Sequence, residues 1–373
     1  MPNHRSTWGG SVIERDGVWH MFASQMVGGC GLDSWASNSR VVRAESKHPF
    51  GPYKLQEVIL PVWAHDANAI EAPTGEIVLF VTSRKGVVPH NCTTATNKSR
   101  TTKTTTTTTT KKKFVRQRHS PKPYNTPPKD TYMLWAPHPK GPWSDPVLVL
   151  NSTIWNADYW NKTNRIAHCD ANLNGIILAN HSFLGLWRRC ETPDLLTIPH
   201  LLTASDWRNA SSYQPSTEPL FVLGGSGAED PSNIWTTIHH SGEKGAAVLA
   251  FHAIFHDEQT TRCMLPTGCS ANGRHAFSLD GRSWRYASTD AYTRTIEFGG
   301  DDDENQTDIS TMTTTLMANT RARPHVILNR LGHPIALSTG LQPQPSQQSD
   351  YVWTLVQPLS ALDSKRFSID SYE

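Results

Sequence analysis

Short apolar stretches that follow turn residues recur along the chain and predict β-hairpins. Each is preceded by another short strand that carries polar residues at its start, and a strand, a glycine turn and a second strand form a hairpin signal. Helical periodicity is hard to find, and 25 prolines argue against long helices. Further strands are expected between the hairpins, at 132–135 and 284–286. The five apolar stretches are 18–23, 77–81, 176–179, 246–251 and 335–337, which follow Gly17, Gly75, Gly175, Gly245 and Gly332.

An internal repeat gives the size of the repeated unit. The motif His48-Pro49-Phe50-Gly51-Pro52-Tyr53 is echoed by His138-Pro139-Lys140-Gly141-Pro142-Trp143, and an extended apolar stretch follows each copy. Positions 48 and 138 lie 90 residues apart, and removal of an insertion of about 40 residues leaves a period of about 50, the size of one propeller blade. The period and the five hairpins predict an all-β fold, a five-bladed β-propeller. A β-sandwich is the alternative, but it does not explain the period.

Two segments look inserted into this propeller, which is expected to span 1–373 as a single domain. The first, at about 89–129, contains a run of threonines at 104–110 followed by three lysines. The second, at about 299–315, contains Asp301-Asp302-Asp303-Glu304 and a threonine-rich end. Segments of this composition cannot bury enough apolar surface to fold, so both are expected to be disordered loop insertions without a catalytic role.

Polar residues begin the first strand of the predicted blades. Three blades place an aspartate two residues before Asn or Ser, at Asp66, Asp170 and Asp230. Because the innermost strand of each blade lines the axis of a propeller, these side chains are expected to converge, although an aspartate at a strand start often only caps a turn. Glycoside hydrolysis requires one protonated and one ionised carboxylate, and crowding of carboxylates beside an arginine produces that asymmetry. The residues expected in this polar funnel are His65, Asp66, Asp170, Glu229, Asp230, Arg323 and His325.

The chain resembles the arabinanase/levansucrase superfamily, and within it glycoside hydrolase family 43, most closely a largely uncharacterised subgroup. The resemblance covers nearly the whole chain except the two insertions, and its motifs are fairly specific in their order. They are Trp-Gly-Gly-Ser at 8–11, Cys-Gly-Leu-Asp-Ser-Trp at 30–35, Asn-Ser-Arg at 38–40, Pro-Phe-Gly-Pro at 49–52, Glu-Asp-Pro at 229–231, His-Ala-Phe-Ser-Leu-Asp-Gly-Arg-Ser-Trp at 275–284 and Arg-Pro-His at 323–325.

The resemblance implies site residues for an inverting glycosidase. Glu229 matches the family's acid, and Asp170 is the candidate for the aspartate that tunes and orients it. Blade one has Trp8-Gly9-Gly10 where the family has its base, so the residue that activates water is expected to be Asp66 on blade two or Asp170. Some family members hold calcium near the site, which His65, Asp66 and His325 could ligate, but the preferred expectation is a site without a cofactor. The residues expected to bind substrate are Trp8, His65, Asp230, His275, Arg323 and His325.

Three functions are consistent with these residues. The first is a glycoside hydrolase that acts on a plant or algal-type polysaccharide or oligosaccharide by acid/base hydrolysis in the axial funnel. The second is a non-catalytic carbohydrate-binding propeller that has lost the blade-one base. The third is a protein-interaction scaffold, which would have a recognition face but no polar funnel. Thirteen tryptophans are explained by packing between sheets or by stacking on sugar rings.

The charge distribution narrows the choice of partner. Between Lys98 and Asp130 there are ten Lys and Arg and one acid, a local charge of +9, so the rest of the chain carries 2 − 9 = −7. Since the basic character belongs to one insertion, nucleic acid is not expected as a partner. No apolar run approaches the roughly 18 residues needed to span a membrane. The expected partner is a carbohydrate, and the protein is expected to be a monomer.

Cysteines and sequons suggest the secretory route. The six cysteines include Cys263 and Cys269, which bracket a short loop and are a candidate disulfide. No signal peptide is visible at the start of the chain, so a secreted glycoprotein whose leader is absent from this chain is expected. The seven Asn-x-Ser/Thr sequons begin at Asn91, Asn97, Asn151, Asn161, Asn180, Asn209 and Asn305.

Overall fold

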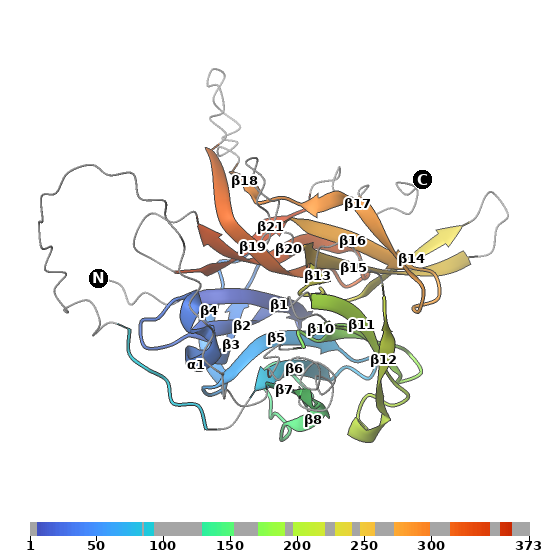
Figure 1. Cartoon of the computed structure of the whole chain (residues 1–373), viewed down its shortest axis with the longest axis horizontal. Helices are drawn as coiled ribbons and strands as arrows, with labels where there is room; N and C mark the ends of the chain where they lie inside the picture. The colour runs from blue at the N-terminus through green and yellow to red at the C-terminus, as the bar shows by residue number, and fades with distance from the viewer. Residues whose placement is uncertain are drawn as a thin grey trace, which may run out of the picture.

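The chain folds as a five-bladed β-propeller, as the hairpins and the repeat predicted (Figure 1). In each blade the strands are antiparallel, and the strand that comes first or second in sequence lies innermost, next to the axis. The computed structural model describes residues 6–83, 86–92, 129–152, 171–190, 197–220, 228–240, 247–257, 272–298, 314–343 and 351–359.

The blades follow one another along the sequence. Blade one is β1 (Thr7–Arg15), β2 (Val18–Met26), β3 (Ser39–Ser46) and β4 (Lys54–Leu60). Blade two is β5 (Ala64–Glu71), β6 (Ile77–Ser83), β7 (Asp130–Ala136) and β8 (Val147–Leu150). Blade three is β9 (Asn174–Ile177), β10 (Phe183–Cys190), β11 (Thr197–Ala204) and β12 (Tyr213–Pro219). Blade four is β13 (Ala228–Glu229), β14 (Trp235–His240), β15 (Ala247–Asp257), β16 (Gly273–Ser278) and β17 (Trp284–Tyr292). Blade five is β18 (Thr295–Phe298), β19 (Thr314–Leu328), β20 (Pro334–Pro343) and β21 (Trp353–Pro358).

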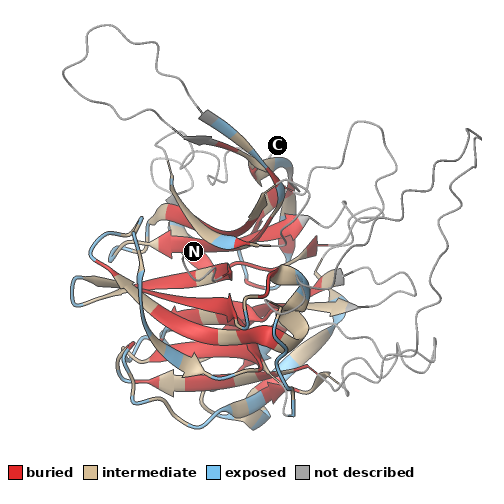
Figure 2. Ribbon diagram, turned by 90° about the vertical axis from the view of Figure 1, so that its left-hand side faces the viewer, coloured by how far each residue is buried: buried red, intermediate tan, exposed pale blue. Residues whose placement is uncertain are grey.

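Apolar side chains fill the spaces between neighbouring blades, where buried residues follow the strands (Figure 2). Blades one and two meet through Phe22 and Leu79, for example, and blades two and three through Phe80 and Phe183. Six tryptophans of the described residues are among the buried side chains, with Trp207 at 0% exposure. Five of them belong to the apolar clusters between the sheets, whereas Trp63 packs beside Trp35 and His65.

The ends of the chain close the ring. Blade five, coloured orange to red, lies beside blade one, coloured blue (Figure 1). The backbone N–H of Thr7 donates to the carbonyl of Val352 at 3.0 Å, and the hydroxyl of Thr354 donates to the carbonyl of Gly9 at 2.7 Å. Backbone groups at the start of β1 are thus paired with β21 and the residue before it.

Side chains near the start of the inner strands connect each blade to the next. The hydroxyl of Ser11 donates to the carbonyl of Ala67 at 3.1 Å and accepts from the N–H of Ala69 at 2.8 Å. Asn233 bonds both backbone groups of Val326, at 3.0 and 2.8 Å. The remaining contacts join Asn68 to Leu173 at 2.9 Å, Asn174 to Pro231 at 3.5 Å and His325 to the backbone of Val12. A ring of five buried or half-buried polar side chains therefore holds the inner strands together.

Blade three differs from the predicted hairpin. The stretch 176–179 was expected to be the second strand, but Ile176 and Ile177 end the inner strand β9, and the second strand is β10. The turn lies at 178–182, where the N–H of Leu178 donates to the carbonyl of Ser182 at 2.8 Å. The prediction was wrong because Gly175 lies inside a strand, where an added Cβ would approach the carbonyl of Leu184 at 2.3 Å.

The predicted insertions fall mainly outside the described residues, which exclude 93–128 and 299–313. Of the first, residues 89–92 and 129 are described, and Cys92 forms a disulfide with Cys30. Of the second, residues 314 and 315 belong to β19. The candidate disulfide of Cys263 and Cys269 also lies outside the described residues.

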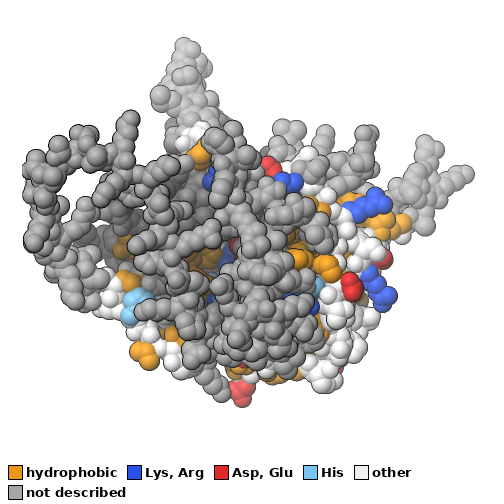
Figure 3. All heavy atoms as spheres, in the orientation of Figure 1, with side chains coloured by type: hydrophobic (Ala, Val, Ile, Leu, Met, Phe, Trp, Pro, Cys, Tyr) orange, Lys and Arg blue, Asp and Glu red, His pale blue; other side chains and the backbone are white. Residues whose placement is uncertain are grey.

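The helices that lie wholly within the described residues are α1 (Trp35–Asn38) and single 3-10 turns at Leu32–Ser34 and Ala210–Ser212. None of these has the length needed to cross a bilayer. Basic and acidic side chains of the described residues lie interspersed along the right-hand rim of the face in Figure 3.

Candidate active site

Five residues in left-handed backbone conformation, one on each blade, surround the axis immediately before or within the inner strands. For residues other than glycine this conformation costs roughly 1 kcal/mol or more, and such positions cluster at functional sites. All five line one small cavity on the axis. This axial ring consists of Gly9 (φ 62°), Asp66 (φ 58°), Asn172 (φ 45°), Asp230 (φ 50°) and Arg323 (φ 55°).

The axial ring corrects the alignment of blade three. The sequence suggested that Asp170 is equivalent to Asp66, because Asp-Ala-Asn occurs at both places. The backbone instead places Asn172 in the ring position, and Asn174 two residues later corresponds to Asn68. Asp170 itself lies outside the described residues. Within the described part of the ring, blade three therefore contributes an amide where a carboxylate was expected.

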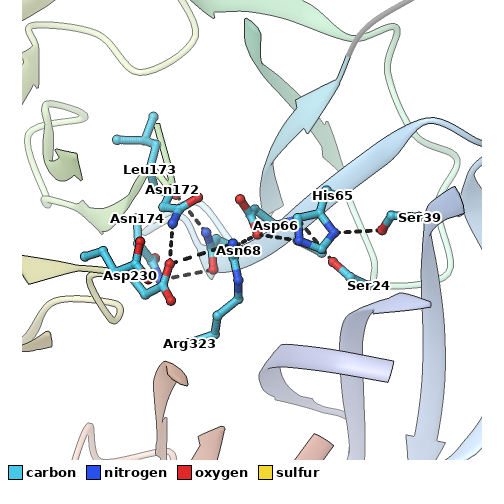
Figure 4. Close-up of polar contacts among 12 residues, drawn as sticks. Ser24, Ser39, His65, Asp66, Asn68, Asn172, Leu173, Asn174, Asp230 and Arg323 are labelled. Atoms are coloured by element: carbon cyan, nitrogen blue, oxygen red, sulfur yellow. Dashed lines mark hydrogen bonds and ion pairs between the residues drawn. The ribbon is translucent and has the colours of Figure 1, made fainter. Parts of the chain in front are cut away.

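Arg323 lies between the two aspartates of the ring (Figure 4). Its guanidinium forms an ion pair with Asp66, and its second terminal nitrogen lies 3.7 Å from Asp230. The aliphatic part of the Arg323 side chain packs over Gly9, where a Cβ added to the glycine would approach the Cβ of Arg323 at 2.9 Å. Burial lowers the pKa of Arg323 to about 9, so the guanidinium remains charged at neutral pH. Gly9 thus makes room for the cation of the ring.

Asp66 is the most enclosed carboxylate of the ring, with a side chain only 1% exposed. Its backbone N–H donates to the hydroxyl of Ser24 at 3.1 Å, and the Nε2 of His65 lies 3.4 Å from its Oδ1. Its Oδ2 is buried and has no hydrogen-bond partner among the described residues. A buried carboxylate with an unused oxygen beside a charged guanidinium has the properties of a functional group.

His65 is fixed by its neighbours. Its Nδ1 lies 2.7 Å from the hydroxyl of Ser39, and its ring lies 5.0 Å from that of Trp35 and 6.3 Å from that of Trp63. The ammonium of Lys129 lies over the ring of Trp35, 3.8 Å from its centroid. The sequence had singled out His65 but had given no role to Lys129, whose position in a predicted insertion concealed it.

Glu229 and Asp230 are adjacent in sequence and close in space. Their carboxylate oxygens and a ring nitrogen of His256 lie within 4.8 Å of one another. Glu229 forms an ion pair with Arg188, and the Nδ1 of His256 lies 3.5 Å from its Oε1. Asp230 accepts a hydrogen bond from the amide of Asn172. The ion pair with Arg188 favours the ionised form of Glu229, which works against a role as proton donor.

The three residues that could have ligated calcium do not fit that ion. Calcium takes six to eight oxygen ligands, whereas His65 and His325 offer ring nitrogens. The one carboxylate of the set, Asp66, is paired with Arg323. A guanidinium therefore stands where the cation would be, and the residues of the axial ring carry their own positive charge.

The other predicted substrate-binding residues occupy different places. Trp8 and His325 line the axial cavity, although Trp8 is 6% and His325 4% exposed. Burial lowers the pKa of His325 to about 3, so the ring is neutral. His275 lies on β16, between β15 and β17 of blade four, where its Nε2 is 2.9 Å from the Nδ1 of His252 and its ring stacks on Trp235. The structure therefore does not bring His275 to the axial ring.

The cavity inside the axial ring measures about 20 Å³, which is room for a single water molecule. The described residues alone thus do not form a sugar-sized pocket at this end of the channel. A cavity of about 890 Å³ opens at the opposite end, where the inner strands finish. Its rim carries ion pairs of Arg15 with Glu71 and of Arg330 with Glu14, which the sequence analysis had not identified.

Solved structures share this fold. No family model and no curated protein matches the chain. A thermostable family-43 glycoside hydrolase has a TM-score of 0.52 at 8% identity, with 95% of this chain and 90% of that protein covered. A protein of unknown function from Dyadobacter fermentans DSM 18053 has a TM-score of 0.50 at 12% identity, with 95% of each protein covered. At these identities the comparisons show one thing: the chain has the five-bladed β-propeller fold found in family-43 glycoside hydrolases.

Proposed function

We propose that the chain is a glycoside hydrolase acting at the axial ring on a plant or algal-type polysaccharide or oligosaccharide. The supporting observation is that Asp66 and Asp230, which are both buried, and Arg323, which is half-buried, converge on the axis from three blades. Burial of charged groups is costly even when they are paired, and perturbed charges of this kind cluster at functional sites. The shared fold with a family-43 glycoside hydrolase supports the same class of reaction.

Asp66 is the proposed base, because its Oδ2 is free of hydrogen bonds within the described residues and lies at the axial cavity. Glu229 is the proposed acid, with His256 beside it. For Glu229 to hold a proton, a bound substrate has to draw Arg188 away or compete with it. In an inverting enzyme the two carboxyl groups lie roughly 6.5–9.5 Å apart, with water between them and the sugar.

A non-catalytic carbohydrate-binding propeller is the second candidate. The observation that favours it is Gly9, which gives blade one no carboxylate, together with the ion pairs that already hold Asp66 and Glu229. This candidate needs the polar funnel but no proton transfer. It therefore predicts that amide variants of the carboxylates still bind glycans.

A panel of glycans separates the two candidates. The wild-type chain, Glu229→Gln and Asp66→Asn are assayed for released reducing ends and for binding to the same glycans. The matched control is Glu71→Gln, because Glu71 lies at the other end of the channel. Hydrolysis by the wild type and by the control, with a loss of at least 100-fold in both axial variants, supports the hydrolase. Binding without hydrolysis by wild type and variants alike would establish the binding protein instead.

A further inference from the structure

Two sequons of blade three share a local geometry that points to covalent modification. Asn180 lies exposed in the turn between β9 and β10, and Asn209 lies exposed between β11 and β12. The Oδ1 of Asn180 accepts hydrogen bonds from the N–H and the hydroxyl of Ser182, at 3.1 and 2.7 Å. The Oδ1 of Asn209 accepts the same pair from Ser211, at 3.1 and 2.7 Å. Each sequon is therefore a closed local turn of the kind that Asn and Ser form on their own.

The amide nitrogens of these two asparagines are available. Because Oδ1 is occupied by the turn, Nδ2 points away from it, and among the described residues neither Nδ2 has a hydrogen-bond partner. Two further sequon asparagines belong to the described residues, while the threonines that complete their sequons, at 93 and 153, do not. Asn91 and Asn151 are engaged in further interactions, and Asn91 directly precedes the disulfide-bonded Cys92.

The disulfide between Cys30 and Cys92 adds an independent observation about the compartment. Stable disulfides form in oxidising compartments, above all along the secretory route and in the periplasm. In the secretory route, Asn-x-Ser/Thr sequons on surface loops are acceptors for N-linked glycans. The disulfide and the two exposed sequon turns therefore point to the same environment.

We infer that Asn180 and Asn209 carry N-linked glycans. The donor is an oligosaccharide linked to a polyprenyl diphosphate. The bond between its anomeric carbon and the diphosphate oxygen breaks, Nδ2 forms a bond to that carbon and gives up one proton, and the polyprenyl diphosphate leaves. No oxidant or reductant takes part.

The position of the two turns fits such a modification. Both lie at the end of blade three where β9 finishes, and the ring residue Asn172 precedes the start of β9. The N–H of Trp207 donates to the carbonyl of His181 at 3.1 Å and holds the two connections together. The glycans thus share one face, and the axial ring lies at the opposite end of the inner strands.

The test uses the full chain behind a cleavable secretory leader, translated in the presence of microsomes, so that the translocated fraction is measured whether or not it is secreted. Glycopeptides are quantified by mass spectrometry after enzymatic removal of glycans in ¹⁸O-labelled water. We expect ¹⁸O incorporation at Asn180 and Asn209, loss of one glycan in Asn180→Gln or Ser182→Ala, and retention in Ser182→Thr. Asn91 and Asn151 are expected to be occupied in a smaller fraction of molecules.

Asn329 offers a matched control, because its Oδ1 accepts from the N–H of Leu331 at 2.9 Å but no hydroxyl residue follows at 331. The exposed Leu331→Ser variant completes a sequon in this turn and is expected to gain one glycan. Unmodified Asn180 and Asn209 in translocated, disulfide-bonded chains would overturn the inference.

Discussion

Oppositely charged side chains at the axis stabilise one another. Arg323 neutralises part of the charge of Asp66 and Asp230, and Gly9 provides the space for its stem. Removal of one member of a buried ion pair leaves an uncompensated charge, which costs about 3–5 kcal/mol. Arg323→Met, which keeps the length of the stem, is therefore expected to lower the free energy of unfolding by about that amount. Urea denaturation of variant and wild type measures the difference.

The exposed pair of Arg330 with Glu14 provides the control for this prediction. Arg330 has a side chain 72% exposed, and solvent screens exposed ion pairs so that they contribute little to stability. Arg330→Met is therefore expected to leave the free energy of unfolding nearly unchanged. If Arg323→Met were equally mild, the guanidinium would not be the partner that makes two buried aspartates tolerable.

Buried histidines make stability depend on pH. Burial lowers the pKa of His325 to about 3 and that of His275 well below its ordinary value of 6.5. The unfolded chain therefore binds more protons than the folded chain below pH 6.5, and the contribution of these histidines is lost as pH falls. The loss amounts to about 2 kcal/mol for His325 between pH 6.5 and 5. Denaturation curves at pH 7 and pH 5 should show this decrease, and His325→Gln should reduce it; an unchanged slope in the variant would contradict the assignment.

The sequence identified most residues of the axial ring but misaligned one blade. Asp66, Asp230 and Arg323 were found because polar residues precede an apolar strand at each place. Asp170 was preferred over Asn172 because Asp-Ala-Asn repeats the letters of blade two. The positive φ at Asn172 decides the alignment of this blade, and a backbone dihedral angle cannot be read from the order of polar and apolar residues. The pairing of Arg323 with both aspartates depends on three blades and was equally invisible.

At the scale of strands, the contacts between inner strands are made by polar side chains. Asn233 is 6% exposed and bonds both backbone groups of Val326 on the next blade. Its replacement leaves two buried backbone groups without partners, and each costs about 1–3 kcal/mol. Asn233→Ala is expected to destabilise the protein by about 3 kcal/mol in chemical denaturation. The exposed Asn319, bonded to Gln342, is the control, and Asn319→Ala should have little effect; equal effects would mean that Asn233 does not link the blades.

These contacts also show why strand starts misled the sequence analysis. His325 was expected to bind substrate; it does line the axial cavity, but it also bonds to the backbone of the neighbouring blade. Hairpins with a glycine in the turn were predicted correctly in blades one, two and five, where Gly17, Gly75 and Gly332 have positive φ. Gly175 does not have a positive φ and lies inside β9, so this glycine allows two strands to approach closely and does not form a turn.

At the scale of the whole molecule, the five-bladed ring was predictable because the repeat and the hairpins are local features that recur. The disulfide that joins two blades was not. Cys30 and Cys92 are separated by 62 residues and belong to no recognisable cysteine motif. Their pairing requires the loop after β2 and the segment after β6 to meet, which happens only once blades one and two are assembled; the N–H of Cys92 then donates to the carbonyl of Gly28 at 2.9 Å.

This disulfide is expected to stabilise the assembled ring mainly by restricting the unfolded chain. A closed loop of 62 residues corresponds to about 4 kcal/mol in the chain-entropy model, and measured values are usually about 2–4 kcal/mol. The double variant Cys30→Ala, Cys92→Ala should therefore lose about 2–4 kcal/mol in urea denaturation under oxidising conditions. The native fold should persist, because Asn38 still donates to the carbonyl of His90 at 2.6 Å and keeps the segment in place. The comparison is made in reductant, where the wild-type disulfide is broken. There the free energy of unfolding of the wild type should equal that of the double variant. A variant as stable as the oxidised wild type would show that the bond does not constrain the unfolded chain.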